Sequence, residues 1–199
     1  MFRIYASQPS IVDAKRRISN VIHTDGQERT LWFEVDLKYQ DMLAVNSMDA
    51  AVVSCLLPAM RAGQDMIVEG SMSSRLYYNV THYLMPILTE FCPSLHSISI
   101  RPVATHRGEP TPATGVMAGF SGGIDSFSNY YDHSGDRAPE EYHITHFVYN
   151  NVGSHGQDAT GKDHDVFVQR YEALRPVADS LGRDFIKVDS NLDEVIGMD

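Results

Sequence analysis

The sequence predicts an α/β protein, with a parallel sheet and crossover helices in its C-terminal part and a small α+β domain before it. After residue 113, apolar segments alternate between strand and helix patterns. The first hundred residues mix hairpin and helix signals without that alternation. Between them, ATHRGEPTPA has the glycine, proline and threonine content of a linker. We therefore expect a small α+β domain at 1–103, a linker at 104–113 and a second domain at 114–199.

The elements of the first domain follow from local signals. ISNVIH and LWFEVDL are β-rich and flank Asp25-Gly26, which predicts a hairpin. DAAVVSCLLPAMRAG has apolar residues at helical spacing and ends at Gly63, a suitable C-cap. DMIVEG predicts a short strand. RLYYNVTHYLMPILTEF predicts a long helix that Pro86 can kink, and SISIRPV alternates as a strand does.

The second domain alternates regularly. GVMAGF, THFVYN and DFIKVD predict strands, while DSFSNYYDH and HDVFVQRYEALRPVADSLG predict the helices between them. Strand–helix–strand–helix–strand order is typical of a parallel sheet with crossover helices. Ligands of such sheets bind at the carboxyl ends of the strands.

The overall charge limits the partners that we expect. The formal net charge is −10, which argues against extensive nucleic-acid contact, because phosphate backbones are bound by clustered lysine and arginine. The basic run Lys15-Arg16-Arg17 is expected to be a solvated face. No segment has the length and apolar character of a membrane span, so we expect no membrane partner.

Two cysteines indicate the compartment. Cys55 and Cys92 form no CxxC pair, so neither a zinc site nor a redox motif is predicted, and Cys55 lies in an apolar segment typical of a core. The N-terminus has no apolar stretch long enough for a signal peptide. We expect a reducing, cytoplasmic location.

SGGIDS, which joins the first strand of the second domain to its helix, has the chemistry of a phosphate loop. A helix N-terminus has unpaired N–H groups and attracts anions. Gly122 and Gly123 lack the Cβ atoms that would hold a phosphate away, and Ser121 and Ser126 can donate hydroxyl hydrogen bonds. Asp125 suits an anion site only if Mg²⁺ lies between its carboxylate and the phosphates. These features predict a site for Mg²⁺ and a nucleotide.

Two better-known phosphate loops do not fit this stretch. The chain has no GxxxxGK[ST], which excludes a Walker loop, and no GxGxxG after the strand, which disfavours a dinucleotide fold. The structural alternative is a glycine turn in which Asp125 is only a helix N-terminal acid.

SGGIDS resembles the SGGxDS signature of the PP-loop ATP pyrophosphatases, the adenine nucleotide alpha hydrolase superfamily. That superfamily includes asparagine synthetase, GMP synthetase, NAD synthetase, tRNA-thiolating enzymes and 7-cyano-7-deazaguanine synthase. The resemblance covers residues 113 to about 192 and matches every fixed position of the signature. The layout also resembles bacterial proteins that pair a small N-terminal domain with a 7-cyano-7-deazaguanine synthase-like domain.

The resemblance implies a ligase-like reaction. A carboxylate or amide oxygen of a small-molecule substrate attacks the α-phosphorus of ATP, pyrophosphate leaves, and a nucleophile then displaces AMP. Asp125 would stand beside Mg²⁺ and share the catalytic role with Ser121. By the same resemblance, ATP would contact the loop and the end of the second strand: Ser121, Gly122, Gly123, Asp125, Ser126, Val148, Tyr149 and Asn150.

Two other polar stretches are candidates near the same edge of the sheet. Within residues 150–165, Lys162 or His155 could contact phosphate or substrate, or the stretch could be a plain surface loop. Residues 189–191, Asp-Ser-Asn, could contact substrate or cap a helix.

The resemblance also implies five parallel strands in the order 3-2-1-4-5, of which this sequence supplies three. The strand GVMAGF is therefore expected at a sheet edge, which is a liability unless something covers it. A missing C-terminal region of a longer protein, a strand of the N-terminal domain, or a second copy in a homo-oligomer could provide the cover.

Three functions remain at this point. The first is an ATP-dependent enzyme that forms AMP and pyrophosphate. The second is a nucleotide-binding sensor or scaffold subunit without turnover. The third, tRNA modification, is disfavoured by the net charge and by the lack of a cysteine in a reactive setting.

Overall fold

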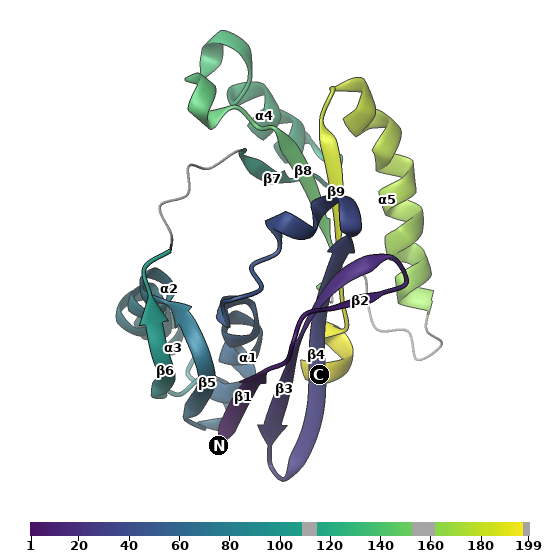
Figure 1. The fold of residues 1–199 in the computed structure, drawn as a ribbon. Helices are drawn as coiled ribbons and strands as arrows, with labels where there is room; N and C mark the ends of the chain where they lie inside the picture. Colours follow the sequence, from purple (N-terminus) through teal and green to yellow (C-terminus); the bar gives the residue numbers. More distant parts are fainter. Residues whose placement is uncertain (109–114, 153–161, 197–199) are drawn as a thin grey trace.

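The computed structural model describes residues 1–108, 115–152 and 162–196. Within them the strands form one nine-stranded sheet in the order β6-β5-β1-β3-β4-β9-β8-β7, and β2 pairs with β3 (Figure 1). The pairs β1–β5, β5–β6, β7–β8 and β8–β9 are parallel, and the others are antiparallel. The sheet is mixed and helices pack on it, which confirms the α/β class.

The first half of the chain supplies six strands and three α-helices. They are β1 (Phe2–Ala6), β2 (Ser10–Val12), β3 (Lys15–Thr24), β4 (Gln27–Asp36), α1 (Asp49–Ala62), β5 (Met66–Ser73), α2 (Ser74–Asn79), α3 (Met85–Phe91) and β6 (Ile100–His106). The hairpin turn at Asp25-Gly26 and the C-cap at Gly63 are confirmed, with positive φ at both glycines. A 3₁₀ helix, η1 (Leu37–Met42), follows β4.

Two predictions for this half need correction. The long helix predicted after Ser74 is divided by a π-helical segment, Val80–Leu84, and Pro86 lies in the first turn of α3, where its missing N–H costs little. β6 continues to His106, so the strand extends three residues into the predicted linker at 104–113. The pairing of Ser71–Ser73 with Ala104–His106 after a bulge explains this extension.

The second half supplies the predicted alternation. It consists of β7 (Met117–Gly119), α4 (Ile124–Asp132), the 3₁₀ turns η3 (Gly135–Arg137) and η4 (Glu140–Tyr142), β8 (His146–Asn150), α5 (Lys162–Ser180), β9 (Asp184–Ser190) and α6 (Leu192–Ile196). The order β9-β8-β7 leaves β7 at the sheet edge, as expected. An N-terminal strand does join this part, but β4 pairs with β9 and not with β7.

Three apolar clusters lie on the sheet, of which the smallest consists of Val35, Tyr39 and Ile186. The largest includes Ile4, Leu31 and Met66 of the sheet, the buried face of α1, and Val195 of α6. The third centres on Phe120 and Phe147 and packs against α4 and α5. Val195 of α6 therefore packs into the core that the first half of the chain forms.

The two halves meet along a short ladder. β4 and β9 share the antiparallel pairs Phe33↔Ser190 and Glu34↔Asp189. Just beyond them, the Trp32 N–H donates to Asn191 Oδ1 at 2.9 Å, and Asn191 Nδ2 donates to the Thr30 carbonyl at 2.9 Å. The sheet thus runs through both halves, while the division into two domains stays a prediction.

The ladder also fixes the directions of the strands. β9 is antiparallel to β4, β4 to β3, and β3 to β1. The carboxyl ends of β7, β8 and β9 therefore lie at one end of the strands, and those of β1, β5 and β6 lie at the opposite end. Among the described residues, no helix has both the length and the apolar character needed to cross a bilayer.

Candidate functional site: the Ser121–Ser126 loop

The loop begins at a firmly held residue. Phe120 is 1% exposed, and its N–H donates to the Val148 carbonyl at 3.0 Å, which continues the β7–β8 pairing. Its ring stacks on Phe147 with centroids 4.3 Å apart. The edge-on ring of Phe127, in the first turns of α4, completes this contact at 5.3 Å. The start of the loop and the helix that follows it are thus joined to one core.

Gly122 is required by the fold itself. Its φ is +73°, a conformation that side chains other than glycine rarely adopt. A Cβ atom there would lie 2.5 Å from Leu174 Cδ2 of α5. The glycine at this position therefore lets the chain turn while the loop lies directly against α5.

Gly123 is not required by the fold. It is the N-cap residue of α4 with φ −80° and ψ 167°, an extended conformation open to any residue. The nearest atom to an added Cβ would be Ser121 Oγ at 3.5 Å, an ordinary contact. Packing of the described chain gives no reason for glycine here, whereas a ligand that approaches the backbone closely would give one.

The N-terminus of α4 has no side-chain cap. The Ser126 and Phe127 N–H groups bond to the Gly123 carbonyl, and Ser126 Oγ donates to that same carbonyl at 2.7 Å. Ser121, Gly123 and Asp125 are exposed. The helix is nine residues long, so the partial positive charge of its first turn is available to an anion.

The end of β8 lies beside the loop but uses its side chains for packing. Gly119 pairs with Val148, whose side chain packs against the Val35, Tyr39 and Ile186 cluster. Tyr149 stacks on Phe167 of α5, with centroids 5.5 Å apart and rings 5° from parallel. Asn150 is exposed at the strand end. Of the three residues proposed near adenine, Asn150 has the side chain free of apolar packing.

A buried polar network at the same edge was only partly anticipated. Asn151 Nδ2 donates to Asp189 Oδ1 at 2.8 Å, and Ser190 Oγ donates to the Asn151 carbonyl at 2.5 Å. Asp189 is 3% exposed, so this network ties the ends of β8 and β9 together. The Leu192 N–H contacts Ser190 Oγ at 3.4 Å at the start of α6, and Asn191 bonds to β4 as described. In the sequence, the run Asn150-Asn151 at the end of a predicted strand was the feature that could have indicated this network.

The remaining candidates of the 150–165 loop cannot be placed. His155 and the side chain of Lys162 lie outside the described residues, although the backbone of Lys162 begins α5.

The basic run near the N-terminus is not the solvated face that was expected. Lys15 Nζ and Arg17 Nη2 each lie 2.6 Å from a carboxylate oxygen of Glu34, whose side chain is 4% exposed. Burial by itself raises the pKa of Glu34, but the hydrogen bonds and positive charges of Lys15 and Arg17 outweigh it and leave the pKa below the usual 4.5. Arg17 also lies over the Trp32 ring, 4.0 Å from its centroid. Sequence spacing gave no sign of Glu34, since it lies on the next strand.

The loop provides a partial set of ligands for Mg²⁺. In the described part of the chain, no three histidine, cysteine or acidic side chains gather as a metal site. A single exposed carboxylate at Asp125 fits an ion that takes its other ligands from phosphate oxygens and water, which is common for Mg²⁺. Asp125 alone is therefore too few protein ligands to hold Mg²⁺ unless another molecule supplies further oxygens.

No family model matches the chain, and no curated protein and no solved structure matches it either.

Proposed function

We propose that this protein binds ATP with Mg²⁺ at the Ser121–Ser126 loop and adenylates a small-molecule carboxylate or amide. The single observation that carries the proposal is Gly123, a glycine that neither φ nor packing requires, at the uncapped N-terminus of α4. Its place at the carboxyl end of β7, within the order β9-β8-β7, supports a nucleotide loop of the PP-loop kind.

In the proposed reaction, an oxygen of the substrate attacks the α-phosphorus of ATP. The bond from that phosphorus to the bridging oxygen breaks, and pyrophosphate leaves with the electron pair. A nucleophile such as ammonia then attacks the activated carbon and gives up a proton, and AMP leaves. Catalysis rests on positioning and on charge stabilisation of the leaving group.

The residues of the loop have distinct parts in this proposal. The free N–H groups of the first turn of α4 and the Ser121 hydroxyl bind the leaving pyrophosphate, and Gly123 lets it approach. Ser126 adds its hydroxyl if it exchanges its present bond to the Gly123 carbonyl for one to phosphate. A Mg²⁺ ion bound with ATP would supply positive charge against the pyrophosphate, with Asp125 as its protein ligand. The cytoplasmic location belongs to the same proposal.

A second candidate, ATP binding without turnover, is favoured by one observation. β7 is an edge strand among the described residues, so one flank of the loop has no neighbouring strand. A sensor or scaffold subunit needs only the binding half of the site.

Calorimetric titration of Mg–ATP into the full chain and two variants tests the proposal. Gly123→Val keeps the extended backbone, which suits a β-branched residue, and adds bulk without charge. Gly108→Val is the matched control, because nothing lies within 4 Å of its added Cβ atom. We expect the parent and Gly108→Val to bind and Gly123→Val to lose binding while all three stay folded.

Absence of binding to the folded parent, or equal binding by Gly123→Val, would overturn the nucleotide site. Where binding is present, chromatography of the nucleotides separates the two candidates. AMP and pyrophosphate released in equal amounts with an added carboxylate or amide support the enzyme. ATP recovered intact across a panel of such substrates supports the sensor or scaffold.

A further inference from the structure

A cavity of about 250 Å³ lies in the N-terminal half, away from the Ser121–Ser126 loop. It opens where β1 ends at Ala6 and β5 continues to Ser73, between the chain after β1, β3, and the segment that leads into α1. These are carboxyl ends of parallel strands, where ligands of such sheets bind. They lie at the opposite end of the strands from the carboxyl ends of β7, β8 and β9, so this cavity is not part of the nucleotide loop.

The wall of the cavity on the α1 side is fixed in place. The Met48 N–H donates to the Ser71 carbonyl at 2.8 Å, which fastens the start of α1 to β5. A Cβ atom on Gly70 would lie 2.7 Å from Met48 Cγ, so only glycine leaves room for this side chain. The backbone bond and the glycine thus hold the start of α1 close against β5 at this wall.

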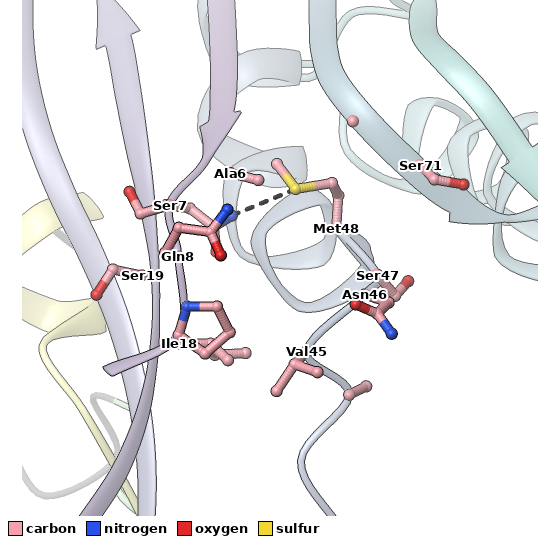
Figure 2. A pocket seen from close by; sticks show the side chains of 14 residues that line it. Ala6, Ser7, Gln8, Ile18, Ser19, Val45, Asn46, Ser47, Met48 and Ser71 are labelled. Carbon is pink, nitrogen blue, oxygen red and sulfur yellow. Dashed lines mark hydrogen bonds between the residues drawn. The ribbon is translucent and has the colours of Figure 1, made fainter. Parts of the chain in front are cut away.

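The lining is polar but uncharged. It contains four serines, three carboxamide side chains and an apolar part that includes Ile18 and Val45. Figure 2 shows Ser7 and Gln8 on one side and Asn46 and Ser47 on the other. None of the lining residues, all of which the structure describes, is acidic, basic or histidine. A charged ligand would find no counter-charge among these residues, which favours an uncharged one.

Asn20 provides the most specific polar group. It is 6% exposed, and its Nδ2 donates to Met48 Sδ at 3.4 Å and to the Tyr5 carbonyl at 3.5 Å. Within the described residues, its Oδ1 accepts no hydrogen bond, yet it is not sealed from solvent, and Asn20 lines the cavity. A ligand that covers this oxygen must offer it a donor, because an acceptor that loses water without gaining a partner is costly.

We propose that this cavity binds a small uncharged molecule with a carboxamide, or with equivalent N–H and C=O groups side by side. The N–H of the ligand donates to Asn20 Oδ1. Serine hydroxyls and the amides of Gln8 and Asn46 can donate to its C=O, while Ile18 and Val45 contact its hydrocarbon part. The cavity is smaller than a site for a drug-sized molecule, so the ligand is a single small ring or short chain.

Nicotinamide and nicotinate are suitable probes, because they have the same size but differ in charge and in the donor. Two-dimensional NMR of the full chain follows each titration at millimolar concentration. We expect nicotinamide to shift the resonances of the Asn20 side-chain amide and the Ser7 and Ser71 backbone amides in a saturable way. Nicotinate should leave them unchanged. Equal response to both probes, or no response to either, would overturn the proposal.

Two variants connect the response to the cavity. Asn20→Leu removes the acceptor and should weaken nicotinamide binding about tenfold, as the loss of one hydrogen bond implies. Asn79→Leu, on the exposed end of α2, is the matched control and should bind as the parent does.

Because Asn20 is buried, its replacement can also disturb folding. Val45 lies outside the sheet and is 37% exposed, so Val45→Trp fills the cavity without replacing a residue of a strand, and it should abolish the response. Unchanged binding by folded Val45→Trp would contradict the assignment even if Asn20→Leu were unstable.

Discussion

At the residue scale, different physical causes explain why the two adjacent positions of the loop hold glycine. Gly122 combines a positive φ with the close approach of Leu174. Gly123 has an ordinary extended backbone and open space around its Cα. The same residue type thus serves the fold at one position and leaves a surface free for a ligand at the next.

Alanine at the two positions should therefore differ in stability. We expect Gly122→Ala to lower the free energy of unfolding by about 3 kcal/mol, because left-handed strain adds to overlap with Leu174 Cδ2. Gly123→Ala should cost less than about 1 kcal/mol, the effect of a poorer N-cap. Urea denaturation measures both values.

The double variant Gly122→Ala/Leu174→Ala separates the two causes. Adding Gly122→Ala to Leu174→Ala should lower the free energy of unfolding by less than adding it to the parent, since the overlap with Leu174 is then relieved and only the left-handed strain remains. Equal costs for the two single variants would show that Gly122 is not held against α5 as described.

At the scale of elements, the β3–β4 hairpin carries a charge network at the buried second half of β4. Glu34 is 4% exposed between Lys15 and Arg17, which reach it from β3. A buried carboxylate is tolerable only while its partners compensate for the lost hydration. The hairpin, and β9 beside it, therefore depend on the ionised form of Glu34.

This dependence predicts a loss of stability in acid. The native pKa of Glu34 is lowered below 4.5, so its contribution is complete above pH 4.5 and is lost as the pH falls through the native pKa. Glu34→Gln should cost about 3 kcal/mol at neutral pH, because two cations lose their buried partner. It should also flatten the acid limb of a stability–pH curve measured by urea denaturation.

Glu28→Gln, on the same hairpin but with a side chain 64% exposed, is the control for this experiment. It should leave the acid limb close to that of the parent. An acid limb of the same steepness in Glu34→Gln and the parent would place the acid sensitivity in other carboxylates.

At the scale of the whole molecule, the sheet is continuous through a narrow junction. Two residue pairs and the side chain of Asn191 join β4 to β9, and Arg29 Nη1 donates to the Val195 carbonyl at 2.7 Å. Val195 in turn belongs to the largest core cluster. Unfolding of the second half should thus expose part of the core of the first.

We therefore expect one cooperative thermal transition for the whole chain. Asn191→Ala should lower its stability by about 2 kcal/mol, since Trp32 N–H and the Thr30 carbonyl both lose a partner. Hydrogen exchange should quicken on both sides of the junction, in β4 and in β9. Asn129→Ala on the exposed surface of α4 should have little effect.

Two separate transitions in calorimetry, with only one of them sensitive to Asn191→Ala, would contradict this expectation. Such a result would instead favour the division into domains near residues 104–113.

Local features could be predicted because their causes are local. The turn at Asp25-Gly26, the end of α1 at Gly63 and the strand–helix alternation after residue 113 each follow from neighbours in the chain. The position of β7 at an edge followed from the order that the resemblance implied. The π-helical segment before α3 was not predicted, since Pro86 indicated only a kink in the helix.

The sequence by itself determined the α/β class, the residues of the candidate loop and the order of its elements, because periodicity and turn chemistry depend on residues a few positions apart. Only the tertiary structure decided that β4 joins β9, that Lys15 and Arg17 serve a buried Glu34, and that Asn20 leaves an acceptor open in a cavity. Each of these brings together side chains far apart in the chain. Such contacts depend on which strands pair and in what register, and no local pattern specifies that choice.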